Sequence, residues 1–419
     1  MKTRSRMRRV AVIRSPGRIA PQVMDDIAES LTFLGHQVLK LDLTEMGAMN
    51  AHTRDEALAC ANRMVSVLCD FRPEMAMSYG LAGLVELGGE NGRPTHLFEW
   101  LKIPYVCLFY DAPLGLAEPL SRWGPSPLAS FVCWDRRYCP WMRSHGVRRL
   151  LYLPLGTNVR VFGKVRPVPS PSRACTFVGS LGVSRLESPL PATPALADAA
   201  QRFIARRLED PCADVETLLD RVAAELPPES AAGFRAFLKT PQADRFRFDV
   251  LARSDVAYRQ SGVARAGLSG GVSVFGDVAW ERLALPGVVY GGPVAYGPDL
   301  ARLYADAAIN LNLTAGHLRE ALNQRMFDAP AAWGFVLTDY RRDLEDLFDL
   351  DREIACFRTL DELPEKLERF RQDGSARERV LKAARRRILA HHTWDRRVDA
   401  LFAWLDKDSP AETLDAAGP

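Results

Sequence analysis

Short apolar runs that alternate with amphipathic stretches constrain the fold of this chain more than any other feature. The first run covers residues 9–15 and ends at a Pro-Gly pair. After it, Ile27, Leu31 and Leu34 recur at the i, i+4, i+7 spacing that marks one face of a helix. A second apolar run follows at residues 37–42. Strand, helix and strand in this order predict a parallel, doubly wound sheet.

This alternation fills the first part of the chain, stops, and then starts again. Further predicted strands of the first series cover residues 74–78, 105–111, 130–133 and 150–153. Residues 164–172 are rich in proline and serine, which marks a linker. Predicted strands of the second series cover residues 175–179, 272–275, 287–290, 308–312 and 334–338. We therefore predict an α/β protein of two Rossmann-like doubly wound domains, over residues 1–165 and 166–392.

One long segment, residues 186–270, interrupts the second series. It is rich in Ala, Leu, Arg and Glu and has few β-branched runs. Ala, Leu, Arg and Glu are strong helix formers, whereas strands favour β-branched residues. We predict that this segment is a mainly helical insertion within the second domain.

The composition excludes several classes of protein. The 55 Lys and Arg residues outnumber the 52 Asp and Glu residues by only +3, which is too little to indicate a nucleic-acid partner or a membrane surface. None of the eight cysteines forms a C-x-x-C pair, which favours free thiols in a reducing compartment over disulfides or a zinc site. No stretch reaches the roughly 18 apolar residues that span a bilayer. We expect a cytoplasmic protein without a transmembrane segment.

Motifs that bind common cofactors are missing from the sequence. No G-x-G-x-x-G follows the first predicted strand, which argues against a dinucleotide cofactor. No G-x-x-x-x-G-K-[ST] and no H-E-x-x-H occurs, which argues against a P-loop NTPase and a zinc protease. We expect that the protein uses neither a cofactor nor a metal ion.

A cluster within residues 304–340 has the residue types that bind a nucleoside diphosphate. Asn312 and Thr314 form a polar strand end, and Gly316 gives the chain the freedom to turn into a helix. Free backbone N–H groups at the start of such a helix suit phosphate oxygens. The pattern indicates a diphosphate site.

Charged side chains of the same cluster would complete this site. Arg325 offers a bidentate guanidinium contact to a pyrophosphate. Asp328 or Glu320 offers a carboxylate to ribose hydroxyls. Two alternatives stay open: Arg325 pairs with a carboxylate on its own helix, and Glu320 is a solvated helix residue.

One stretch of the chain resembles a known family. Residues 325–348 resemble the R-x-F-(E/D)-x-x-A-x-G-x-x-L-T-D-x-x-x-D-L-x-x-L-F stretch of the spore-maturation-protein-type glycosyltransferases. Further blocks of that family resemble residues 153–158, 177–180, 274–277, 309–312 and 392–397. The resemblance implies the GT-B fold, a family-1-like enzyme, and a nucleotide-sugar donor held by the C-terminal domain. It also implies that residues 393–419 form a helix that packs back on the N-terminal domain, followed by a tail.

The resemblance assigns donor contacts to residues that follow predicted strands. Gly179 and Ser180 fall where related enzymes contact the donor phosphates. Gly276 and Asp277 fall where the nucleotide base lies.

The resemblance also bears on the ribose contact. It places Asp328 at the carboxylate that holds the donor ribose. Glu320 and Asp328 make an E-x₇-D pattern where related enzymes have E-x₇-E, so the spacing is kept and the second side chain is one methylene shorter.

The N-terminal half is expected to bind the acceptor. The turn that ends at Gly17 resembles the loop after the first GT-B strand, which approaches the donor phosphates or the acceptor. Asp111 follows a strongly apolar predicted strand, and a carboxylate there would act as the general base that deprotonates the acceptor hydroxyl. The alternative is that Asp111 caps the turn before Pro113.

The diphosphate site and the family resemblance together imply a metal-independent enzyme that moves a sugar from a nucleoside diphosphate sugar to an unidentified acceptor. A sugar-nucleotide epimerase is one alternative, although it requires a cluster of acid and base groups that the sequence does not show. A catalytically silent nucleotide-sugar-binding protein is the other. The products formed would distinguish the three.

Overall fold

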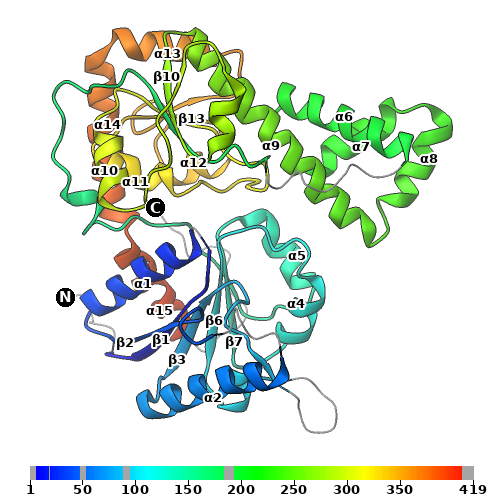
Figure 1. Ribbon diagram of the computed structural model, residues 1–419, viewed down its shortest axis with the longest axis vertical. Coiled ribbons are helices and arrows are strands. Elements are labelled where there is room, and N and C mark those ends of the chain that lie inside the picture. Colours follow the sequence, from blue (N-terminus) through cyan, green and yellow to red (C-terminus); the bar gives the residue numbers. More distant parts are fainter. Residues whose placement is uncertain (1–5, 18, 48–52, 88–94, 184–192, 408–419) are drawn as a thin grey trace. The chain divides into compact units, whose positions relative to one another are not determined.

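The chain folds into two compact units, each with its own parallel sheet (Figure 1). The computed structural model describes residues 6–17, 19–47, 53–87, 95–183 and 193–407. Unit 1 comprises Met1–Asn158 and Thr393–Pro419, and unit 2 comprises Val159–His392. This is the predicted fold class of two doubly wound α/β domains.

The sheet of unit 1 has six strands in the order β2-β1-β3-β6-β7-β8, all paired in parallel. The strands are β1 (Arg9–Arg14), β2 (Gln37–Asp42), β3 (Met75–Tyr79), β6 (Tyr105–Phe109), β7 (Ala129–Cys133) and β8 (Leu150–Tyr152). A separate antiparallel pair joins β4 (Glu86–Leu87) to β5 (Thr95–His96). The strand order reverses direction between β1 and β3, which is where doubly wound sheets bind ligands.

The helices of unit 1 are α1 (Ala20–Phe33), α2 (Arg54–Phe71), α3 (Leu97–Trp100), α4 (Ala117–Trp123), α5 (Cys139–Ser144) and α15 (Trp394–Leu405). The last of these, α15, comes from the end of the chain and packs against α1. Thr393 caps its first turn by accepting a hydrogen bond from the backbone N–H of Arg396. The backbone of Gly156 lies so close to Thr393 that a Cβ there would come within 2.9 Å of the Thr393 carbonyl carbon. The absence of a side chain at Gly156 therefore allows α15 to join unit 1.

The sheet of unit 2 has six parallel strands in the order β11-β10-β9-β12-β13-β14. These strands are β9 (Thr176–Val178), β10 (Val272–Phe275), β11 (Val288–Tyr290), β12 (Asn310–Asn312), β13 (Val336–Asp339) and β14 (Ala355–Phe357). The order reverses between β9 and β12. Unit 2 begins at Val159, earlier than the predicted boundary, because Phe162 is fully buried among residues of unit 2 and lies 5.3 Å from the ring of Tyr296.

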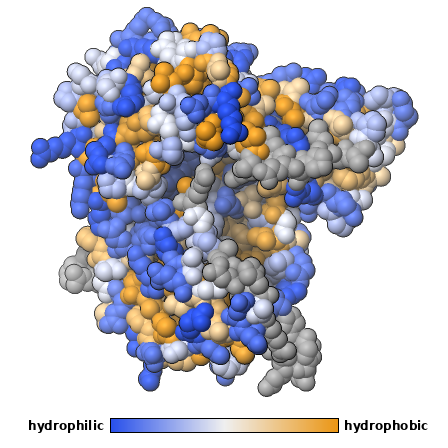
Figure 2. All heavy atoms as spheres, viewed as in Figure 1, coloured by the Kyte–Doolittle hydropathy of each residue, from blue (hydrophilic) through white to orange (hydrophobic). Residues whose placement is uncertain are grey.

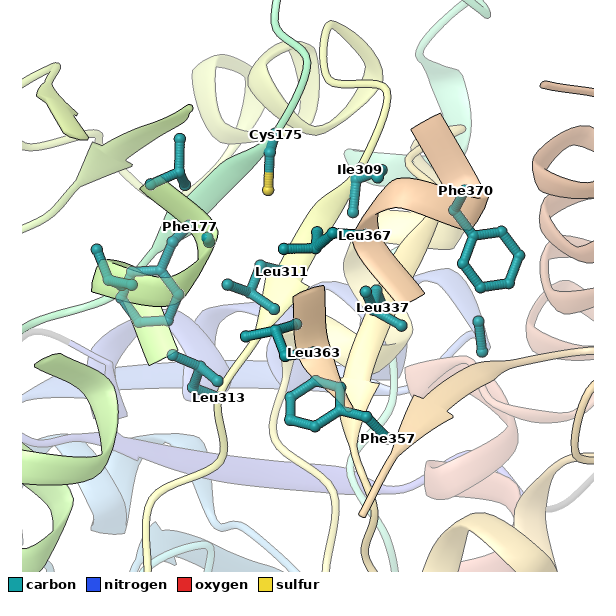
Figure 3. Close-up of a cluster of buried hydrophobic side chains, with 14 of the residues drawn as sticks. Cys175, Phe177, Ile309, Leu311, Leu313, Leu337, Phe357, Leu363, Leu367 and Phe370 are labelled. Carbon is teal, nitrogen blue, oxygen red and sulfur yellow. The ribbon is translucent and has the colours of Figure 1, made fainter. Parts of the chain in front are cut away.

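Helices cover the sheet of unit 2 and bury its core (Figure 3). They are α10 (Pro298–Ala305), α11 (Arg325–Ala331), α12 (Asp343–Leu347), α13 (Leu363–Gln372) and α14 (Gly374–His391). Leu363 and Leu367 of α13 are fully buried beside Leu311 of β12 and Leu337 of β13. Each buried leucine contributes roughly 1.5–3 kcal/mol through removal of apolar surface from water.

The predicted helical insertion is confirmed over the described part of its window. Residues 193–270 form α6 (Pro194–Glu209), α7 (Val215–Glu225), α8 (Pro228–Phe237) and α9 (Gln242–Leu268), with no strand between them. The insertion has its own hydrophobic core, to which α9 contributes Phe246 and Val250. Further along the same helix, Tyr258 and Val263 belong to the core of the sheet. One long helix thus ties the insertion to the sheet.

On the face drawn in Figure 2, hydrophobic residues lie in small groups among hydrophilic ones. No helix in the described part of the chain combines the length and apolarity that crossing a bilayer requires.

Candidate functional site

The carboxyl edge of the unit 2 sheet brings together most of the predicted donor residues. Gly179 follows β9, Gly276 follows β10, Asn312 ends β12 and Asp339 ends β13. Because all of these strands are parallel, their carboxyl ends meet at one edge of the sheet. The switch point between β9 and β12 lies at this edge.

Two glycines at this edge allow neighbouring strand ends to approach closely. The backbone N–H of Gly179 donates to the Phe275 carbonyl at 2.8 Å, and the Trp280 indole donates to the Gly179 carbonyl at 2.8 Å. A Cβ at Gly276 would overlap the Gly179 carbonyl oxygen. A side chain at this position is therefore excluded by the neighbouring strand.

Ser180 and Asp277 continue from these glycines. Ser180 is exposed, and its carbonyl accepts a hydrogen bond of 3.1 Å from Arg259 on α9. Asp277 accepts a hydrogen bond of 3.4 Å from the backbone N–H of Gly182 on Oδ2. Its Oδ1 is buried and has no hydrogen-bond partner among the described residues. An acceptor oxygen is therefore left for a donor from outside the chain.

Arg325 occupies the switch point and is held there by neutral groups. Its Nη1 donates to Oδ1 of Asn312, which is fully buried and also accepts from Asn323 at 2.7 Å. The guanidinium carbon lies 5.4 Å from the centre of the Phe177 ring. A Cβ at Gly179 would lie 3.3 Å from its Nη2, so this glycine makes room for the guanidinium.

No carboxylate among the described residues balances the charge of Arg325. Within the described part of the chain Arg325 makes no ion pair, and its buried Nε has no hydrogen-bond partner. The alternative in which Arg325 pairs with a carboxylate of its own helix is therefore not what the structure shows. The half-buried cation has an unmet preference for an anion.

Asp328 lies on the same helix and has other partners. It is 1% exposed. Its Oδ1 accepts from the Gln324 amide at 3.0 Å, and its Oδ2 accepts from the Tyr296 hydroxyl at 3.2 Å. A ribose contact would add a hydroxyl donor to a carboxylate that already accepts these two hydrogen bonds, and this role stays a prediction.

Glu320 lies in the loop between β12 and α11, so the interpretation that it is a helix residue is wrong. Its carbonyl accepts a hydrogen bond of 3.1 Å from the backbone N–H of Asp343, which is distant in the sequence. The two carboxylates of the E-x₇-D pattern therefore belong to different elements. The donor role of Glu320 stays a prediction.

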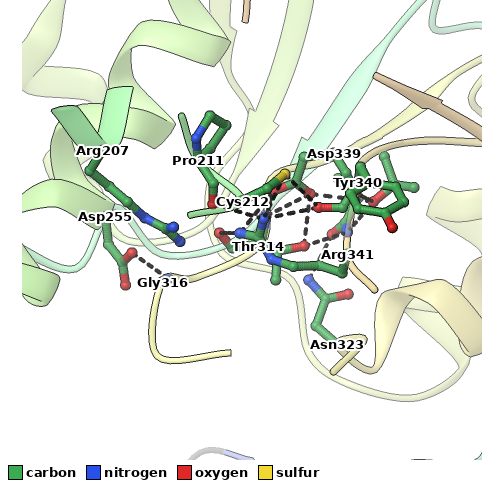
Figure 4. Close-up of polar contacts among 12 residues, drawn as sticks. Arg207, Pro211, Cys212, Asp255, Thr314, Gly316, Asn323, Asp339, Tyr340 and Arg341 are labelled. Carbon is green, nitrogen blue, oxygen red and sulfur yellow. Dashed lines mark hydrogen bonds and ion pairs between the residues drawn. The ribbon is translucent and has the colours of Figure 1, made fainter. Parts of the chain in front are cut away.

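Thr314 is tied to a buried ion pair that sequence reasoning missed (Figure 4). Both Asp339 oxygens accept from the Thr314 backbone N–H at 3.0 Å, and Oδ1 accepts from its hydroxyl at 2.7 Å. Asp339 also pairs with Arg341 at 3.2 Å, and both side chains are almost completely buried. Arg341 donates to the carbonyls of Thr314 at 3.3 Å and Pro211 at 3.1 Å. The Thr314 hydroxyl thus supports the loop, and a donor contact by it stays a prediction.

The helical insertion also holds this loop. The backbone N–H of Gly316 donates to Asp255 on α9, and Arg207 of α6 lies beside it (Figure 4). A Cβ at Gly316 would come within 2.7 Å of Asp255 and 3.2 Å of Arg207. Burial, reinforced by the charge of Arg341, lowers the pKa of Arg207 to about 10. The loop after β12 is therefore positioned by residues far away in the sequence.

The carboxyl edge of the unit 1 sheet carries the residues expected on the acceptor side. Asp111 is exposed and lies two residues beyond the end of β6. Its Oδ2 accepts a hydrogen bond of 2.7 Å from the hydroxyl of Tyr79, which ends the neighbouring strand β3. Burial and the charge of Asp111 raise the pKa of Tyr79, so its hydroxyl keeps its proton. Sequence reasoning missed Tyr79, although its place at a strand end was a usable signal.

Gly17 lies at the same edge, after β1. It is exposed and has a φ of +137°, which favours glycine. In the described part of the chain, no group of three or more His, Cys, Asp or Glu side chains is placed to hold a metal ion.

Several solved structures resemble this chain over nearly its whole length, and the following three are among them. A glycosyltransferase from Rickettsia africae has a TM-score of 0.52 at 9% identity, covering 96% of this chain and 100% of that chain. Sucrose-phosphate synthase from Thermosynechococcus elongatus has a TM-score of 0.51 at 11% identity, covering 95% and 99%. The Anabaena protein Alr3699/HepE, determined in complex with UDP, has a TM-score of 0.50 at 12% identity, covering 95% and 99%. Identities this low establish the fold alone.

The chain has the GT-B fold, and its residues 257–403 match a family described as glycosyl transferase-like. The matched segment runs from α9 to α15 and includes Asn312, Arg325 and Asp328. A search of curated proteins finds no match to the chain. The fold and the family match confirm the prediction of a glycosyltransferase.

Proposed function

We propose that the protein transfers a sugar from a nucleoside diphosphate sugar to an acceptor hydroxyl and that Arg325 binds the donor diphosphate. The observation that carries this proposal is a half-buried guanidinium at the switch point with no carboxylate partner among the described residues. Asn312 orients this guanidinium through its side-chain oxygen. A diphosphate would supply the anion that the described residues do not.

The proposed chemistry is a displacement at the anomeric carbon. The acceptor oxygen forms a bond to that carbon, and the bond to the diphosphate oxygen breaks with its electron pair leaving on the nucleoside diphosphate. Arg325 stabilises the negative charge that grows on the leaving group. Asp111 takes the proton of the acceptor hydroxyl while Tyr79 orients the carboxylate. We assign the free Oδ1 of Asp277 to an N–H donor of the nucleotide base.

The proposal extends to metal dependence, family type and cellular environment. We propose that Arg325, and not a divalent cation, balances the diphosphate charge, so transfer should persist in a chelator. We also propose that the protein is a glycosyltransferase of the spore-maturation-protein type and that it works in the cytoplasm. A reducing environment suits its eight free cysteines.

Nucleotide binding to Arg325→Ala tests the proposal most directly. UDP is the first ligand to measure, because the Anabaena protein of the same fold was determined with UDP. Loss of a desolvated Arg–phosphate pair costs about 2–5 kcal/mol, so the affinity for the cognate nucleotide should fall about 30-fold or more. Calorimetry on the folded variant measures this, with Arg302→Ala, an exposed arginine paired with Asp299, as the matched control.

Unchanged nucleotide affinity in folded Arg325→Ala would refute the diphosphate assignment. Product analysis then separates the enzyme classes. Free diphosphate with a glycosylated acceptor supports transfer, an isomerised donor indicates an epimerase, and tight binding without product indicates a silent binding protein.

A further inference from the structure

A pocket lies in unit 2, at the edge of the sheet opposite the donor residues. It has a volume of about 300 Å³ and is formed by the turn before β14 and by helices α13 and α14. Asp351 and Arg352 line it just before β14 begins at Ala355. Because the sheet is parallel, the amino end of β14 lies at the edge away from Asn312 and Asp339, which end their strands. The pocket is therefore separate from the donor site.

Positive charge dominates the rim of this pocket. Four cationic side chains line it, Arg352, Lys366, Arg369 and Arg379, against the single carboxylate of Asp351. Arg352 pairs with Asp349 at 3.2 Å. The other three cations make no ion pair within the described part of the chain, although Arg387, also on α14, pairs with Glu353 at 3.0 Å. Unpaired like charges around one cavity repel each other, and a bound anion would relieve that repulsion.

The floor of the pocket is apolar. Ala355, Phe370, Ala376 and Val380 line it and are each at most 8% exposed. Phe370 belongs to the core of the sheet (Figure 3). The guanidinium carbon of Arg369 lies 5.2 Å from the centre of the Phe370 ring. Burial raises the pKa of Cys356 to about 11, so this lining thiol is neutral and adds no negative charge.

We propose that this pocket binds a small phosphate monoester with an apolar body. Arginine and lysine from two helices bind the phosphate, since guanidinium groups offer paired donors to phosphate oxygens. The apolar body lies on the floor formed by Phe370 and Val380. The volume is at the lower end of the range for small-molecule sites, which suits a body of about one aromatic ring.

Phenyl phosphate and inorganic phosphate are the probes that test this site. Calorimetry at low salt should show saturable binding of phenyl phosphate, with inorganic phosphate binding at least about 10-fold more weakly because it cannot use the apolar floor. The double variant Arg369→Gln/Arg379→Gln should weaken phenyl phosphate binding about 10-fold or more. Both arginines are exposed, so the variant should fold, which circular dichroism and thermal melting check.

Two control variants separate this pocket from other anion sites. Arg352→Gln removes a rim cation that already has a partner and should change binding less than about 3-fold. Arg325→Ala removes the proposed donor cation and should leave phenyl phosphate binding unchanged. The proposal is overturned if the parent protein shows no saturable binding, if the double variant binds like the parent, or if Arg325→Ala abolishes binding.

Discussion

The carboxyl edges of the two sheets differ in chemistry, although both sheets are six-stranded and parallel. In unit 1, the edge presents an exposed carboxylate, Asp111, with a phenol, Tyr79, that keeps its proton. In unit 2, the edge presents a half-buried cation, Arg325, and the buried ion pair between Asp339 and Arg341. The same kind of sheet thus supports a proton acceptor in one unit and an anion site in the other, because side chains at strand ends set the chemistry.

The largest effect that would sharpen this comparison is expected from Asp111→Asn. If Asp111 is the general base, transfer should fall by about 10²–10⁴-fold while nucleotide affinity stays unchanged, because the amide cannot take the proton. Initial rates with an identified acceptor and calorimetry with the nucleotide measure the two quantities. Tyr79→Phe, which keeps the carboxylate and removes its hydroxyl partner, should reduce transfer less than Asp111→Asn does. Activity of Asp111→Asn within a few-fold of the parent would instead support the turn-capping role.

In unit 2, Arg341→Met tests whether the buried ion pair between Asp339 and Arg341 stabilises the carboxyl edge of the sheet. Removal of one partner leaves the buried Asp339 carboxylate without its counter-charge, which should cost about 3–5 kcal/mol of unfolding free energy. Chemical denaturation measures the loss. Arg342→Met is the matched control, because Arg342 is an exposed neighbour whose pair with Glu345 should contribute less than about 1 kcal/mol. Equal stability of the two variants would contradict the assigned support.

A smaller effect concerns acid stability and involves unit 1. His96 is fully buried between the rings of Tyr105 and Trp123, and burial lowers its pKa to about 4. An unfolded histidine titrates near pH 6.5, so the unfolded chain binds a proton that the folded chain excludes between pH 6.5 and about 4. The contribution of neutral His96 to the free energy of unfolding is therefore complete above pH 6.5. It decreases as the pH falls, by about 2 kcal/mol at pH 5.

Hydrogen exchange at pH 7 and pH 5, corrected for intrinsic rates, locates this loss. Amides around β5 and α3 should lose protection at pH 5. His96→Asn keeps a side chain that can cap α3 and removes the titrating group, so its protection should change less between the two pH values. The same pH dependence in the variant would show that another group is responsible.

Several elements followed from local sequence patterns. Apolar runs with helical spacing between them predicted the parallel sheets, and the lack of β-branched runs over residues 186–270 predicted helices there. The full extent of α9 carried no such signal, because Phe246 faces the core of the insertion while Tyr258 faces the core of the sheet. A helix that is buried on different sides along its length does not repeat one apolar face.

The site residues were partly predictable. Arg325 was identified as a cation in the polar cluster within residues 304–340, and the structure shows it without an ion-pair partner in the described part of the chain. Asp328 was identified by the same reasoning, and the structure shows it buried under Tyr296 and Gln324. Sequence spacing specifies which residues share a helix or strand. The hydrogen-bond donors around a buried carboxylate come from several helices, strands and loops, which sequence spacing does not specify.

The sequence by itself determined the doubly wound sheets, the helical insertion and the position of glycines just after predicted strands. These features depend on the residue types and backbone propensities of a few neighbouring residues. Only the tertiary structure decided that Tyr79 donates to Asp111, that Arg341 reaches Pro211, and that Gly316 is held by Asp255. These contacts join residues 32, 130 and 61 positions apart. Their formation depends on how whole elements pack, which local patterns do not encode.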